Sequence, residues 1–125
     1  MRLAALGLLL LFGCRNPAEG DRSPLPSGGY FVYGFASRPQ LGTAILKLQV
    51  FDKDGNRTTA FRVLGSSGMP AMRGAHDTKD VPFQLNKKGD YLLPVEIAMP
   101  GEWEITLVFF DADKAVHRAS FRFKV

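Results

Sequence analysis

The sequence lacks several features on which common enzyme classes depend. It has one cysteine, Cys14, and two histidines, His76 and His117. No Gly-rich phosphate loop opens a helical pattern, and no serine lies in a G-x-S-x-G turn. Carboxylate pairs such as Asp111 and Asp113 fall in a turn or on the polar face of a predicted strand. These absences predict a protein that is not an enzyme.

The sequence also lacks a concentrated run of basic residues. Its formal net charge is +4, from 16 Lys and Arg against 12 Asp and Glu. The basic residues are scattered through predicted strands and turns, whereas a nucleic-acid surface needs a basic stripe beside stacking aromatics. We therefore expect no nucleic-acid partner.

The sequence has no apolar run long enough to span a membrane. Arg2 precedes an apolar run from Leu3 to Phe12 of about ten residues, too short to cross a hydrocarbon core about 30 Å thick as a helix. The following "LFGC" resembles the bacterial lipobox, whose cysteine is lipidated and becomes the new N-terminus. We predict a lipoprotein signal peptide over residues 1–13, with a plain secretory signal or a buried helix as the alternative.

Lipidation also explains why Cys14 is the only thiol, because an unpaired cysteine in an exported protein invites oxidation. A thioether lipid together with further acyl chains such as palmitate anchors a protein stably. The sequence therefore predicts a protein attached to a membrane on the periplasmic or extracytoplasmic side of a bacterial envelope.

Two regions follow the signal peptide. Residues 14–29 contain the lipidated cysteine and then prolines, glycines, serines and isolated charges, a composition typical of a flexible tether. An ordered first strand is the alternative, but three prolines disfavour it. Residues 30–125 are long enough for one domain with one core.

The predicted domain alternates apolar and polar residues with period two and shows no sustained helical period. An Asp-Gly turn at 54–55 predicts a hairpin that joins two of the strands, 41–51 and 57–64. Pro94 lacks an amide donor and predicts an edge position or a bulge. About seven strands with one apolar face each predict an all-β fold, an antiparallel β-sandwich. The predicted strands are 30–37, 41–51, 57–64, 81–86, 90–99, 100–110 and 115–125.

Trp103 and its neighbouring aromatics are expected to fill the space between the sheets. Met99 and His117 lie in register with inward faces, which favours packing roles over metal binding. The side chains expected to point inward are Ala44, Leu46, Leu48, Val50, Thr59, Phe61, Val63, Tyr91, Leu93, Val95, Ile97, Met99, Trp103, Ile105, Leu107, Phe109, Ala119, Phe121, Phe123 and Val125.

The segment 65–80 has no strand pattern and is longer than most connections between strands. It contains Met69, Met72 and His76. Thioether sulfur is a soft ligand that suits Cu(I), and neutral imidazole binds copper in either oxidation state. These three residues are therefore the candidate metal ligands, for a copper ion. The alternative is that this loop binds nothing tightly and that Met69 covers the open end of the sandwich.

The segment "MPAM…H" followed by "GDYLLPVEIAMPGEWEITLVF" resembles the YtkA-like domain family, which is related to the FixH proteins. The resemblance spans roughly residues 40–125. It implies an immunoglobulin-like sandwich without enzymatic activity and an envelope role in copper handling. It also implies a partner in oxidase assembly or metal efflux. A lipid anchor replaces the transmembrane helix of FixH. The alternative function is a metal-free protein-interaction module of an envelope complex, for which the aromatic strand 30–36 offers an edge surface.

Overall fold

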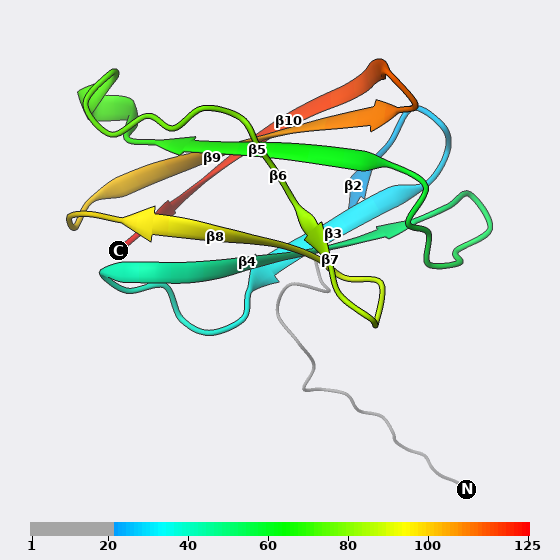
Figure 1. The fold of residues 1–125 in the computed structure, drawn as a ribbon, viewed down its shortest axis with the longest axis horizontal. Coiled ribbons are helices and arrows are strands. Elements are labelled where there is room, and N and C mark those ends of the chain that lie inside the picture. The colour runs from blue at the N-terminus through cyan, green and yellow to red at the C-terminus, as the bar shows by residue number, and fades with distance from the viewer. Residues whose placement is uncertain (1–21) are drawn as a thin grey trace, which may run out of the picture.

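The computed structural model describes residues 22–125, which form two antiparallel sheets packed as a sandwich (Figure 1). The five-stranded sheet has the order β2-β3-β4-β8-β7, and the four-stranded sheet has the order β10-β9-β5-β6. This confirms the predicted all-β, immunoglobulin-like sandwich. Among the described residues, no helix is long and apolar enough to cross a membrane. The predicted signal peptide, Cys14 and the tether up to residue 21 lie outside the described residues.

Six strands are long and three contain only two residues each. In chain order the elements are β2 (Ser23–Pro24), β3 (Tyr30–Phe35), β4 (Gly42–Phe51), β5 (Arg62–Gly68), the 3-10 turn η3 (Pro70–Met72), β6 (Val81–Pro82), β7 (Gln84–Leu85), β8 (Tyr91–Ile97), β9 (Glu102–Asp111) and β10 (Lys114–Lys124).

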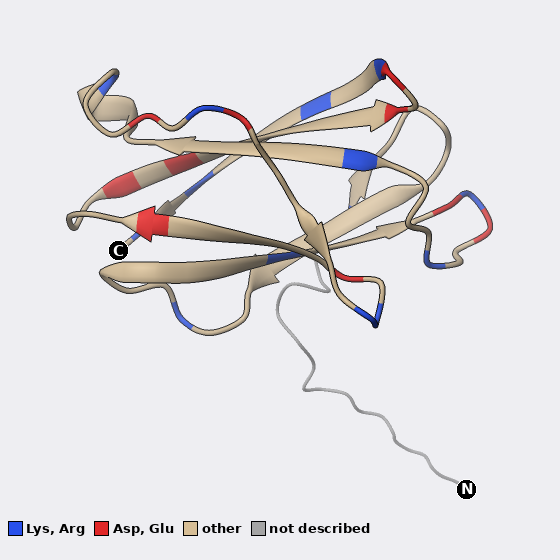
Figure 2. Ribbon diagram, in the orientation of Figure 1, with Lys and Arg blue, Asp and Glu red and all other residues tan. Residues whose placement is uncertain are grey.

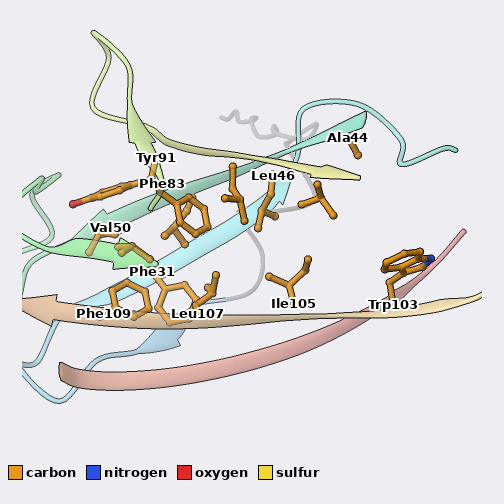
Figure 3. Close-up of a cluster of buried hydrophobic side chains, with 14 of the residues drawn as sticks. Phe31, Ala44, Leu46, Val50, Phe83, Tyr91, Trp103, Ile105, Leu107 and Phe109 are labelled. Carbon is orange, nitrogen blue, oxygen red and sulfur yellow. The ribbon is translucent and has the colours of Figure 1, made fainter. Parts of the chain in front are cut away.

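The core lies between the sheets and is built from the faces that alternation predicts (Figure 3). On β9, Trp103, Ile105, Leu107 and Phe109 are all at most 1% exposed. The predicted inward residues of β4 and of β8 are buried in the same way. The inward side chains of β10 are only half-buried, because β10 is the outermost strand of its sheet. Burial of these large apolar side chains supplies the main stabilisation of a domain without disulfides.

The folded region begins earlier than the sequence predicted. Residues 22–29 were assigned to the tether, but Ser23–Pro24 pairs with the start of β3. Leu25 is 5% exposed and belongs to the core, and its N–H donates to the carbonyl of Gly29 at 2.9 Å. The tether assignment is therefore wrong for these residues. The prolines that argued against a strand are tolerated because β2 is a two-residue edge strand.

The predicted hairpin between 41–51 and 57–64 is also wrong. The turn forms, with Asp52 Oδ1 accepting the N–H groups of Asp54 and Asn56, but only the single bridge between Phe51 and Arg57 follows it. The chain then crosses to the other sheet, where β5 pairs with β9. As a result Thr59, expected inside, is exposed. The predicted loop also loses its first residues, because 65–68 belong to β5.

Pro94 lies where β8 has no neighbour on one side. Within the described chain, β7 covers β8 only at Tyr91 and Leu92. On the other side Pro94 is opposite Ile45 of β4. The carbonyl of Ile45 points away from β8, because it accepts the N–H of Ala36, just after β3. An N–H group at position 94 would therefore point to the uncovered edge of β8, which agrees with the predicted edge position. Because proline has no N–H, this edge is a poor partner for a strand of another molecule.

A buried carboxylate fixes the turn before β8. Asp90 is 5% exposed. Its carboxylate accepts hydrogen bonds from Gln49 at 2.9 Å, from Asn86 at 3.3 Å and from Arg57 at 2.9 Å. Burial alone would raise the pKa of Asp90. The hydrogen bonds from Gln49 and Asn86, with the charges of Lys47 and Arg57, outweigh burial and lower this pKa below its ordinary value. The ionised form is therefore the one that the fold binds.

Asp90→Asn is expected to lower the free energy of unfolding at pH 7 by about 1–3 kcal/mol, because it weakens the bonds to a charged, buried acceptor. Since the folded pKa is depressed, the charge contributes fully above the unfolded pKa of about 4 and loses its contribution as pH falls below it. The difference between wild type and variant should therefore shrink on acidification in denaturant titrations. Asp113→Asn, on the exposed turn before β10, is the control. A pH-independent difference contradicts the assignment.

Candidate metal site

The loop that carries the candidate ligands is closed at its base. The N–H of Thr78 donates to the carbonyl of Ser67 at 2.9 Å, and the hydroxyl of Thr78 accepts the N–H of Ser67 at 2.9 Å. Asp77 accepts the N–H of Gly74 at 2.9 Å and lies directly over Gly68. Residues 68–77 therefore leave and rejoin the sheet at the same place, like a compact surface loop.

Both methionines belong to one turn of this loop. Met69 precedes η3 and Met72 ends it, and the N–H of Met72 donates to the carbonyl of Met69 at 2.9 Å. The N–H of Ala75 then donates to Met72 at 3.1 Å, which carries the turn towards His76. Met69 itself is the extended N-cap of η3, so the turn joins the two methionines through their backbones. The backbone thus collects the three predicted ligands on eight consecutive residues.

The two methionines differ in their surroundings. Met69 is 4% exposed and belongs to the core, whereas Met72 is 38% exposed. Space for Met69 comes from Gly101, because a Cβ at that position would lie only 2.8 Å from Met69 Cε. The expectation that Met69 covers one end of the sandwich agrees with this burial. Met69 therefore has a packing role whether or not it binds a metal.

His76 lies against the tryptophan that starts β9. The ring centroids of His76 and Trp103 are 6.0 Å apart, with planes tilted by 48°. His76 is half-buried, and Trp103 is 1% exposed. The indole N–H of Trp103 donates to the carbonyl of Met99 at 3.0 Å, which holds the ring in place. The buried indole ring of Trp103 therefore lies beside one predicted ligand.

An ion pair fixes the middle of the loop to β9. Arg73 Nη2 lies 2.6 Å from Glu104 Oε1, and Arg122 of β10 lies 3.4 Å from the other carboxylate oxygen. The hydrogen bond from Arg73 is the main reason that the pKa of Glu104 lies below its ordinary value. The same bond raises the pKa of Arg73. Figure 2 shows the two acidic positions near the start of β9.

Sequence reasoning missed the residues that position the loop. Gly101, Trp103 and Glu104 lie about thirty positions after their partners Met69, His76 and Arg73, so no local spacing could pair them. The only sequence signal was the proline-glycine turn before the tryptophan strand. The three contacts hold the loop against the β8–β9 end of the sandwich.

Other metal ligands are not collected near the loop. Within residues 22–125, no group of three or more His, Cys, Asp or Glu side chains lies close enough to hold a metal ion. His117 instead packs between Phe31 and Phe109, at ring distances of 6.3 and 5.8 Å, in agreement with the packing role expected for it.

The aromatic strand 30–36 is occupied within the molecule. Tyr33 stacks on Phe121 at 3.9 Å, and Phe35 packs on Phe123 at 4.8 Å. Tyr30 stacks on Phe51 of β4. These rings close the side of the sandwich between β3 and β10.

In comparisons with known proteins, the chain matches no family model and no curated protein.

Proposed function

We propose that this protein is a lipid-anchored bacterial envelope protein whose β-sandwich is a YtkA-like domain that binds copper transiently. Met69, Met72 and His76 are the proposed ligands, and copper handling, delivery or oxidase assembly is the proposed role. The proposal includes no catalytic step. Lipidated Cys14 and a shorter tether than first expected, up to about residue 21, would place the domain near the membrane surface.

One observation supports copper binding most directly. Two thioethers and an imidazole lie on a loop of fixed shape, with both methionines in a single hydrogen-bonded turn. Two sulfurs and one nitrogen form a soft ligand set that suits Cu(I) better than harder cations. Because the loop is anchored at its base and along β9, little chain entropy is lost when its side chains bind a metal.

The unequal burial of the methionines suggests how copper would enter. Met69 is fixed in the core, while Met72 is exposed and unbranched and can change rotamer quickly. Copper would first meet Met72 and His76 at the surface, and Met69 would bind it from the interior side. Three ligands leave a fourth position open to a donor or an acceptor protein, which favours transfer over storage.

Replacing both methionines by leucine is expected to lower the Cu(I) affinity at least about tenfold, or about 1.4 kcal/mol of binding free energy. Competition titration with a Cu(I) chelator measures this directly. Met72→Leu alone should produce much of the loss, because it removes one of the two proposed thioether ligands. It should leave the fold intact, because the exposed side chain contributes little to the core. Leucine at 69 conserves volume and is expected to cost less than about 1.5 kcal/mol of stability.

Met99→Leu is the matched control for this titration. Met99 packs partly buried against the same core but is not a proposed ligand. Its replacement should leave the Cu(I) affinity unchanged. Equal affinities for wild type, the double variant and the control would show that copper does not bind through the loop.

A metal-free interaction module is the second candidate function. The long outer strand β10 favours it, since its far side has no neighbour in the described sheet. Capture of one envelope partner with the same efficiency with and without copper would support this candidate over the first.

A further inference from the structure

We propose that the free edge of β10 docks an extended segment of a partner protein in which acidic and apolar side chains alternate. The segment adds as a fifth strand to the four-stranded sheet. This inference names the partner surface for the interaction role and does not depend on copper binding.

The backbone of β10 offers a regular set of hydrogen-bonding groups that have no partner within residues 22–125. Val125 and Gly101 exchange both backbone hydrogen bonds, at 3.2 and 3.0 Å. In an antiparallel ladder such pairs alternate with pairs whose N–H and C=O groups point away from each other. The pairing of β10 with β9 therefore directs the backbone N–H and C=O groups of every second β10 residue away from β9, towards the free edge. These residues are Arg118, Ser120, Arg122 and Lys124.

The edge is long and without interruption. β10 is the outermost strand of its sheet (Figure 1), and its one irregularity lies between Ala115 and His117, before the four outward residues. No proline interrupts the strand. The uncovered edge of β8, by contrast, carries Pro94 and cannot donate there. An edge of this length without proline is a template for an added strand.

The charges on β10 select the partner. Side chains of the four outward residues are exposed, and three of the four are basic (Figure 2). Antiparallel pairing of two β10 strands in the registers centred on residue 120 or 121 would place Arg118 opposite Arg122 or Lys124, and like charges directly opposite are destabilising. Within the described chain Arg118 and Lys124 form no ion pair, whereas Arg122 lies 3.6 Å from Glu102 and 3.4 Å from Glu104 of β9. Acidic side chains of an incoming strand would complement the two unpaired charges of this row.

The other face of the incoming strand meets an apolar surface. Phe121 and Phe123 point inward from β10 but stay half-buried, stacked on Tyr33 and Phe35 of β3. Successive side chains of a strand point to opposite faces. Apolar residues between the acidic ones would therefore extend this aromatic seam, while their acidic neighbours face the basic row.

Hydrogen exchange of the free, full-length chain tests the edge itself. The N–H groups of residues 119, 121 and 123 should exchange slowly because they bond to β9. Those of 118, 120, 122 and 124 should exchange fast. Slow exchange at all seven positions would mean that another segment of the chain, or a second copy at high concentration, already covers the edge. Either result overturns the proposal.

A labelled ten-residue peptide of alternating Glu and Val is the probe for docking, measured by fluorescence anisotropy at low salt. It should bind at least about tenfold more tightly than a peptide of alternating Lys and Val, since the charge pattern sets specificity. Binding should slow exchange at the four outward N–H groups. Failure of the Glu/Val peptide to bind, or protection at the β8 edge instead, overturns the proposal.

Ser120→Pro and Ser120→Ala form a matched pair of variants. Proline removes an outward N–H that has no partner in the described part of the chain, and the free edge tolerates its ring. We expect Ser120→Pro to weaken peptide binding at least about tenfold and Ser120→Ala to leave it unchanged. Arg118→Glu, which leaves the backbone intact, should reduce the preference for the Glu/Val peptide, because it replaces one of the two unpaired basic side chains with an acidic one. Equal binding by wild type, Ser120→Pro and Arg118→Glu overturns the proposal. None of these substitutions lies in the loop of residues 68–77 that carries the proposed copper ligands, so this test and the copper titration can fail independently.

Discussion

Replacing Gly29 with alanine is expected to lower the free energy of unfolding by about 3 kcal/mol. A Cβ at this position would overlap the carbonyl oxygen of Phe51 and lie 3.1 Å from two backbone atoms of Asp52. Backbone atoms cannot rotate away as a side chain can, so the turn before β3 must shift. That shift also disturbs the bond from the Leu25 N–H to the Gly29 carbonyl. Guanidinium denaturation followed by the fluorescence of Trp103, the only tryptophan, measures the loss.

Ser27→Ala is the control for this experiment, because Ser27 is exposed in the same turn. Its denaturation midpoint should stay close to that of the wild type. Comparing Gly29→Ala with Ser27→Ala shows whether residues 22–29 belong to the folded domain or to a flexible tether. If the segment were a flexible tether, both substitutions would have equally small effects, and the early start of the domain would be refuted.

Alternation predicted most of the fold because each strand of a sandwich buries one face. The inward residues of β4, β8 and β9 follow from period two alone, since burial repeats every second residue whatever the strand pairs with. Which strands pair with each other was harder to predict. The turn at 54–55 fits a hairpin locally, but β5 pairs with β9, which lies about forty residues further on. A turn signal specifies where the chain reverses and does not specify which strand it joins.

The sequence could predict which residues form the candidate site, but not how deeply each side chain is buried. The sequence places Met69, Met72 and His76 on one loop, and the structure brings both methionines into one turn. Residue type alone could not show that Met69 is buried and Met72 exposed, because the space that Met69 fills depends on the distant Gly101. Glycine leaves the space into which Met69 packs, and that contact joins residues 32 positions apart.

Gly29 and Leu25 illustrate a different limit. Proline, glycine and serine in residues 15–29 gave a composition typical of disorder, and the tether assignment followed from that average. One buried leucine, one glycine under a backbone carbonyl and the pairing of Ser23–Pro24 with β3 hold the last part of the segment in the fold. Average composition does not register such single contacts.

Trp103→Ala is expected to have the largest effect of any core substitution, lowering the free energy of unfolding by about 3–5 kcal/mol. Trp103 is the largest fully buried side chain among the described residues, and its removal leaves a cavity beside the loop of residues 68–77. It also removes the ring against His76 and the donor to the Met99 carbonyl. Amide exchange in residues 69–76 should therefore accelerate more than the overall loss of stability explains. Denaturant titration by circular dichroism and native-state hydrogen exchange measure the two effects.

Two further variants make the Trp103 result specific. Phe110→Ala removes an aromatic ring from the opposite face of the same strand, where it stacks under Arg62 at 4.4 Å, and should cost only about 1 kcal/mol. Trp103→Phe keeps most of the packing while losing the indole donor, so it should remain folded if the alanine variant does not. Since the ring fills the core and orders the loop, Trp103→Phe should show intermediate stability and intermediate exchange in residues 69–76. Equal losses for Trp103→Ala and Phe110→Ala would refute the role of the tryptophan as the support beneath the loop.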